Sequence, residues 1–167
     1  MNLQVDPVLL DVIIQGTAAG LQMTEVIPNP VGASRLATAR HGMTVIVGLV
    51  GKSSGSVMMN FAEAGVYHLA GLMLGEPQTE LSEDNIDAVM EIGNIVAGSI
   101  KDHLLGTDME VREISLPSLV LGASYSMVYA RGITTVSVEF EIPGIPASKL
   151  YDRYFSTTIS LMRRAGS

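Results

Sequence analysis

The spacing of apolar and polar residues along the chain predicts four helices. They are expected at residues 6–23, 63–74, 82–105 and 147–164. Asp6 is suited to cap the first helix, with Pro7 at its first position, and Ser82 is suited to cap the third. Gly75 and Gly106 follow the second and third helices, where glycine commonly ends a helix. The third helix is the longest predicted element.

Runs rich in β-branched residues predict strands between these helices. They are expected at residues 43–50, 56–61, 110–116, 118–130 and 133–141. Turns are predicted at 51–55, between the first two strands, and at Arg131 and Gly132, between the last two. Residues 26–32 are predicted to form a loop. In the last strand apolar and polar residues alternate, which indicates a sheet with one covered face.

The order of the elements predicts a mixed α/β (α+β) fold built from one unit that occurs twice. Each half, at about 6–75 and 82–165, would be α-β-β-α-like, and together they would form a pseudo-symmetric, mostly antiparallel sheet with long helices packed on it. Two pairs of stretches resemble each other: 26–34 with 114–124, and 58–74 with 139–162. Two ordinary hairpins with flanking helices remain the alternative. Because each half is too short to bury its own faces, we expect a single domain over 1–167.

Composition narrows the classes of function. The chain has 167 residues, of which 47% are hydrophobic, so it can form a packed core. Its net charge of −7 argues against a protein that binds nucleic acid or an anionic membrane surface. No stretch is long and apolar enough for a transmembrane helix, and the amino-terminal residues do not resemble a signal peptide.

The residues that commonly bind metals or form disulfides are few. The chain has no cysteine, which excludes disulfides and thiolate zinc sites and agrees with a cytoplasmic location. His41, His68 and His103 are scattered along the chain and form no cluster of ligands. We therefore expect no metal bound by this chain.

The longest predicted helix carries a polar face. With about 100° between successive residues, Asp87, Glu91 and Asn94 fall within an arc of about 60°. Gly98 lies on the same face one turn beyond Asn94 and would leave space for a partner, and Ile95 is a large apolar residue at its margin that could contact one. A carboxylate beside a carboxamide can pair with a lysine and hold a water molecule. Spacing alone also suits an ordinary solvated helix face.

A longer pattern includes this face and resembles a known family. Asp87 is followed after three residues by Glu91, after two more by Asn94, and after twenty-two more by Pro117. These intervals are those of the CheC/CheX/FliY family of response-regulator phosphatases, in which the first position is Ser or Asp. The residues from Glu91 to Ser99 and the predicted order of elements also resemble that family.

The resemblance implies an enzyme that removes the phosphoryl group from the aspartyl phosphate of a CheY-like receiver domain. Asn94 would orient the attacking water, and Glu91 would pair with a lysine of the receiver. Pro117 would shape the entry into a strand and take no part in the chemistry. Asp87 fills the Ser/Asp position and has no assigned role beyond contact with the partner.

The resemblance also implies partners and cofactors. The receiver would bind Mg²⁺, and this chain would bind no cofactor. Aligning the first predicted helix on the third places Asp11, Gln15 and Ala18 at the positions of the motif, without its acid or its amide. The chain is therefore most similar to CheX-like members with a single site, which leads us to expect a homodimer. The alternatives are a receiver-binding module without catalysis and a dimeric scaffold protein.

Overall fold

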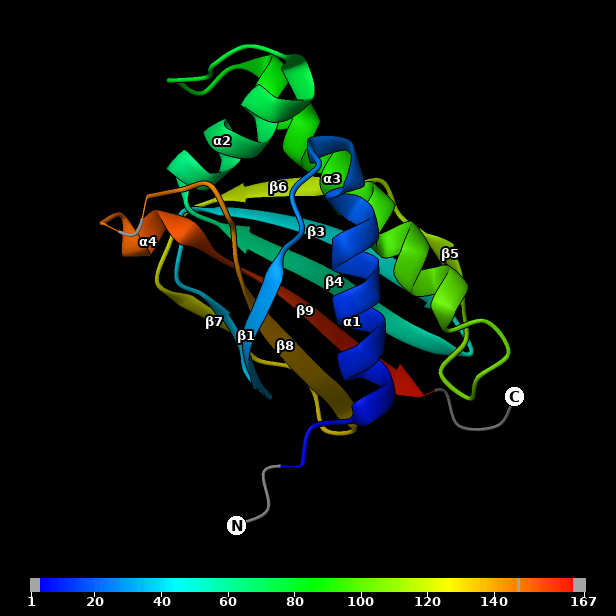
Figure 1. Cartoon of the computed structure of the whole chain (residues 1–167). Helices are drawn as coiled ribbons and strands as arrows, with labels where there is room; N and C mark the ends of the chain where they lie inside the picture. Colours follow the sequence, from blue (N-terminus) through cyan, green and yellow to red (C-terminus); the bar gives the residue numbers. More distant parts are fainter. Residues whose placement is uncertain (1–3, 147, 164–167) are drawn as a thin grey trace.

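A single antiparallel sheet forms the middle layer of the fold (Figure 1). The computed structural model describes residues 4–146 and 148–163, and within them seven strands join in the order β1-β8-β9-β4-β3-β5, with β6 also paired to β3. The strands are β1 (Asn29–Ser34), β3 (Met43–Gly51), β4 (Ser53–Phe61), β5 (Val111–Ile114), β6 (Ser118–Leu121), β8 (Ile133–Glu141) and β9 (Tyr154–Arg163). Every pair is antiparallel, as predicted.

Two long helices cover one face of this sheet. Helices α1 (Pro7–Gly20) and α3 (Glu83–His103) lie side by side across it, while α2 (Glu63–Leu74) lies beyond one end (Figure 1). The short helices are η1 (Gln22–Thr24) and α4 (Leu150–Arg153). Gly20 allows α1 to approach α3 closely, because a β-carbon there would overlap the side chain of Val96. The helices and alternate residues of the strands enclose one hydrophobic core.

A two-stranded ribbon contacts the opposite face of the sheet. It consists of β2 (Ala37–Ala39) and β7 (Tyr125–Met127), paired antiparallel. The hydroxyl of Tyr125 donates to Thr44 Oγ1 at 2.7 Å, and the side-chain amide of Asn60 donates to the carbonyl oxygen of His41 at 2.8 Å. Thr44 and Asn60 alternate with residues that face the helices, so these bonds attach the ribbon, and the segment that follows β2, to the sheet's other face.

The strand order is symmetrical about the β9–β4 pair. On one side β8 and then β1 follow, and on the other β3 and then β6. This arrangement confirms the predicted fold class, a mixed domain with a mostly antiparallel sheet and helices on it. The stretches 26–34 and 114–124 resemble each other in sequence. The first contains β1 and the second contains β6, and these strands lie at equivalent places on the two sides of the sheet. The boundaries proposed for the two halves stay a prediction.

The carboxyl end differs most from expectation. A helix over 147–164 is wrong: only Leu150–Arg153 is helical, and β9 follows in the centre of the sheet. Positions 147 and 164 lie outside the described residues. Buried Phe155, Ile159 and Leu161 alternate with serine and threonine, a period-two pattern rich in β-branched residues that favours a strand. Pairing with β4 and β8 then satisfies the backbone on both sides.

Two smaller predictions also need correction. The loop expected at 26–32 is in part strand β1. The run at 118–130 forms two strands, β6 and β7, because backbone at Gly122 (φ 147°) and Ser124 (φ 62°) breaks it between them. The turn at residues 131 and 132 is present, but the strands that it joins do not pair with each other. The predicted helices at 63–74 and 82–105 and the strands at 43–50 and 56–61 are confirmed.

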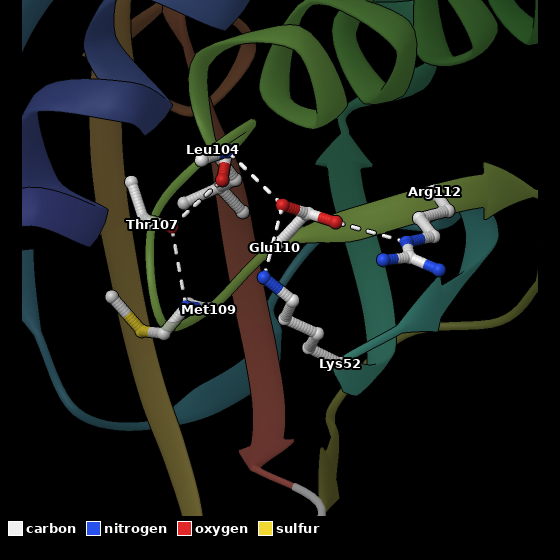
Figure 2. A network of polar contacts seen from close by, with 7 residues as sticks. Lys52, Leu104, Thr107, Met109, Glu110 and Arg112 are labelled. Carbon is white, nitrogen blue, oxygen red and sulfur yellow. Dashed lines mark hydrogen bonds and ion pairs between the residues drawn. The ribbon is translucent and has the colours of Figure 1, made fainter. Parts of the chain in front are cut away.

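A buried carboxylate ties three segments together at the end of α3 (Figure 2). Glu110 accepts hydrogen bonds from Arg112 Nε at 2.9 Å, from the backbone N–H of Gly106 at 3.2 Å and from Lys52 Nζ at 3.3 Å. These donors, with Arg112 the strongest, hold the pKa of Glu110 below its ordinary value of 4.5. The charged form therefore links the turn after α3 to the β3–β4 hairpin.

Glu110 is expected to make stability depend on pH in the acid range. Because its pKa is lower in the folded chain, its contribution is complete above the unfolded pKa and is lost as the pH falls through the folded pKa. The gap in urea midpoint between wild type and Glu110→Gln should thus shrink as the pH falls from above 4.5, the ordinary pKa, through the lower folded pKa. A constant gap over that range would contradict a role for the charge.

Candidate functional site

Local hydrogen bonds define the beginning of α3, the helix that carries the candidate site. Ser82 Oγ accepts from the backbone N–H of Asn85 at 3.3 Å, and Asn85 Oδ1 accepts from the N–H of Ser82 at 2.9 Å, a reciprocal cap. Glu83 and Asp84 in the first turn suit the positive end of the helix dipole. Starting from this fixed end, the orientation of every later residue on α3 follows from the helical repeat.

Close packing on the inner side fixes how far α3 can rotate. A β-carbon at Gly93 would lie 2.5 Å from Val45 Cγ1 on β3, so the helix backbone approaches the sheet there. Ile92 and Val96 are fully buried on the side next to α1. With these contacts made, the face that carries the motif points away from the sheet.

The residues of the predicted polar face lie at or near the surface of the chain. Asp87 and Glu91 are exposed, while Asn94, Ile95 and Gly98 are half-buried. Within residues 4–146 and 148–163, the side chains of Asp87, Glu91 and Asn94 have no hydrogen bond or ion pair. Their polar atoms are therefore available to a molecule outside the chain.

This face is not optimised for the stability of the helix. Asp87 and Glu91 are like charges one turn apart, which costs about 0.2–0.5 kcal/mol. Asn94 is a poorer helix former than alanine by up to about 0.7 kcal/mol, and Gly98 by about 1 kcal/mol. A β-carbon at Gly98 would meet no atom of the described residues within 4 Å, so packing in this part of the chain does not require glycine. Residues that weaken a helix without an internal reason are typical of functional sites.

Pro117 lies in the edge of the sheet that borders α3. It is half-buried, one residue before β6, where the edge changes from β5 to β6. Strand β5 pairs with Leu49–Gly51 of β3, and β6 pairs with Met43–Ile46 of the same strand. Both β5 and β6 also contact α3. Proline has no N–H to donate, so it suits a break between two paired segments. The strand-entry role expected of Pro117 stays a prediction.

The positions on α1 that correspond to the motif lack its side chains and its arrangement. Asp11, Gln15 and Ala18 are all exposed, and Gln15 Nε2 donates to Asp11 Oδ2 at 2.7 Å. The acid on this helix therefore already has a partner, and no amide stands at the position of Asn94. This arrangement agrees with one complete motif, on α3.

Lys101 also lies on the face of α3 that carries the motif, although the motif itself does not include it. It is seven residues beyond Asn94, two helical turns, and this spacing was the signal available in the sequence. Its side chain is 35% exposed, and Nζ lies 3.8 Å from Asp102 Oδ1.

Two hollows on the described part of the surface lie away from the motif. One of about 240 Å³ lies between the β1–β2 segment and the sheet, with Arg40, His41 and Glu139 in its wall. A second, of about 650 Å³, lies between α2 and the segment after it. Neither is lined by a residue of the motif. The candidate site is a projecting helix face, which suits a macromolecular partner better than a small ligand.

The histidines occupy unrelated positions. Burial lowers the pKa of His41, whose ring packs edge-on to Tyr151 with the centroids 4.5 Å apart. His103 Nδ1 lies 2.7 Å from the carbonyl oxygen of Ser99. Among the described residues, no group of three or more histidines and carboxylates could hold a metal ion. In the same part of the chain, no helix combines the length and the apolar character needed to cross a membrane.

Comparison with known proteins decides the family. The family model described as "Chemotaxis phosphatase CheX" matches residues 43–141, which include the whole motif from Asp87 to Pro117. The chain belongs to the CheX family. The comparison with curated proteins found no match.

Solved structures share the fold of this CheX family member over most of its length. Chemotaxis protein CheX from Vibrio vulnificus is 21% identical, with a TM-score of 0.74 over 90% of this chain and 97% of that one. The CheX of a CheX–CheY–BeF₃–Mg²⁺ complex from Borrelia burgdorferi is 19% identical, with a TM-score of 0.72 over 95% and 99%. FliY from Thermotoga maritima is 18% identical, with a TM-score of 0.59 over 91% and 84%. At these identities the likeness concerns the fold.

Proposed function

We propose that this CheX family member removes the phosphoryl group from the aspartyl phosphate of a CheY-like receiver domain. The observation that carries the proposal is the Glu91–Asn94 couple, which has no partner among the described residues and lies on the outer face of a capped helix at the family's spacing. Support for the partner comes from the Borrelia burgdorferi CheX, which forms a complex with CheY, BeF₃ and Mg²⁺.

The proposed chemistry is the hydrolysis of an acyl phosphate. A water oxygen attacks phosphorus as the bond from phosphorus to the aspartyl oxygen breaks, which yields inorganic phosphate and a free carboxylate. An acyl phosphate is reactive already, so the main contributions are an in-line water and neutralised charge. The carboxamide oxygen of Asn94 can accept a hydrogen bond from that water, and its NH₂ group can donate one to a neighbouring oxygen.

The other residues of the face would serve docking. The carboxylate of Glu91 would pair with a receiver lysine, which aligns the two proteins as well as holding them together. Gly98 would let the receiver approach beside Asn94, with Ile95 and Asp87 as contacts at the margin. In this proposal Mg²⁺ belongs to the receiver and this chain binds no cofactor. A homodimer and a cytoplasmic location stay predictions.

The function is tested by the decay of phosphorylated receivers. Receiver domains from the same cell would be labelled with ³²P, and loss of label would be followed with and without the chain. Faster decay of at least one receiver is expected. A chain that binds a phosphorylated receiver without accelerating its decay would instead be a docking module, and the proposal would be wrong.

Glu91→Gln is expected to weaken recognition of the receiver. The change removes the charge that pairs with lysine but keeps the shape of the side chain. KM should therefore rise by about 3–10-fold, which corresponds to the strongest of the exposed ion pairs or slightly more. Stability should be unchanged or slightly higher, because the repulsion with Asp87 is lost. Steady-state dephosphorylation over a range of receiver concentrations measures this effect. Asp11→Asn on the exposed face of α1 is the matched control, and equal effects of the two changes would contradict the role of Glu91.

A further inference from the structure

The face of α3 that carries the motif is negatively charged toward the start of the helix and positively charged toward its end. Asp87 and Glu91 place two carboxylates toward the start of the helix, and Lys101 places an ammonium group toward its end. Asn94, Gly98 and Lys101 are spaced four and three residues apart and so form one stripe. The rise from Asn94 to Lys101 is about 10 Å, and the open position at Gly98 separates them.

Lys101 is only loosely held within the chain. Its contact with Asp102 is an ion pair of 3.8 Å between neighbouring residues, and the Asp102 side chain is 76% exposed. Surface pairs of this kind contribute about 0–1 kcal/mol, so an external anion can compete for the ammonium group. Within the described residues Lys101 forms no other ion pair or side-chain hydrogen bond.

The polarity complements the partner of the proposed function, on which the inference rests. When a receiver lysine pairs with Glu91 and the phosphoryl group lies at Asn94, the next side chain along the stripe, beyond Gly98, is that of Lys101. Its positive charge then faces the same anionic phosphorylation site from the opposite side of the Gly98 gap. Charges arranged in this way set the orientation of docking and raise the rate of association.

We infer that Lys101 is a specificity-determining residue that makes docking depend on the phosphoryl group of the receiver. Lys101 does not touch the attacking water and is not part of the chemical step. Its effect is on the difference in affinity between the phosphorylated and the free receiver, and thus on KM.

A purely structural role for Lys101 makes a different prediction. A cation in the last turn of a helix offsets the negative end of the helix dipole. Removing it would then lower the stability of the fold and leave the preference for a phosphorylated partner unchanged. The two roles are separable by measuring binding and unfolding on the same proteins.

The test uses a series in which the charge at this position changes from positive to neutral to negative. Wild type, Lys101→Arg, Lys101→Gln and Lys101→Glu would each be titrated with the receiver that decays fastest in the assay above, with and without beryllofluoride and Mg²⁺. Wild type and Lys101→Arg should prefer the beryllofluoride form. Lys101→Gln should reduce that preference by about 2–5-fold, and Lys101→Glu should reduce it further. In both variants the affinity for the beryllofluoride form should depend less on salt concentration than in wild type. Lys149→Gln, an exposed lysine beside α4, is the matched control and should leave the preference unchanged.

The outcomes separate the inference from the proposed function. If all the Lys101 variants keep the wild-type preference for the beryllofluoride form, the inference is wrong and the phosphatase proposal is unaffected. The same holds if Lys149→Gln loses as much of that preference as Lys101→Gln. A wild-type chain that neither binds a receiver nor accelerates its decay overturns both. A graded rise in KM from Lys101→Gln to Lys101→Glu, with kcat unchanged, supports the inference.

Discussion

Asn94→Ala is expected to remove most of the chain's acceleration of receiver dephosphorylation, a fall of about 10²-fold in kcat. The carboxamide is the group on this face that can both donate and accept a hydrogen bond, and alanine can do neither. The fold should not suffer, because alanine is the better helix former by up to about 0.7 kcal/mol and Asn94 has no partner among the described residues. The decay assay and a thermal unfolding curve on the same sample measure both effects.

The matched control for Asn94→Ala is Gln15→Ala on α1. Like Asn94→Ala, it removes a carboxamide from a helix face, here an exposed one at a position related to the motif, and it should leave kcat unchanged. Binding of the beryllofluoride-activated receiver should persist in Asn94→Ala, since Glu91 and Lys101 remain. A variant that keeps its wild-type kcat would show that the water is oriented by another group.

Phe155→Ala is expected to destabilise the fold by about 3–5 kcal/mol, the range for truncation of a fully buried aromatic residue. Phe155 is 1% exposed and stacks between Phe61 and Phe140, with ring centroids 5.0 and 5.3 Å away. It stands on β9, the strand that joins the two halves of the sheet. Since small domains have a total stability of about 5–15 kcal/mol, this loss is a large share of it.

Urea unfolding at equilibrium measures the effect of Phe155→Ala. Met162→Ala, on the same strand, is the control, because that side chain is 41% exposed and should cost about 0.5 kcal/mol or less. Equal costs for the two variants would contradict the central position of β9. Any Phe155→Ala protein that stays folded should retain its kcat, because α3 is fixed by its own cap and by β3.

The candidate site could be located from sequence because its geometry is local. One helical repeat relates Asp87, Glu91 and Asn94, and the cap at Ser82 is made by residues within four positions of it. The family spacing to Pro117 needed no knowledge of the fold. Two other features depend on what lies around α3. Among the described residues, Glu91 and Asn94 have no partner and the space at Gly98 is empty.

The sequence by itself determined the helices and hairpin strands whose signals lie within a few residues: α1, α2 and α3 with their caps or terminal glycines, and the β3–β4 pair. The tertiary structure decided the remainder of the sheet. Strand β9 forms because β4 and β8, distant in sequence, supply partners for its backbone on both sides, and β7 leaves the run after β6 to pair with β2. A helix satisfies its hydrogen bonds within its own segment, so a local pattern suffices to predict it, whereas a strand depends on neighbours that only the folded chain brings together. The same difference explains why the motif on α3 was visible in sequence, while its outward orientation required the packing of that helix on α1 and β3.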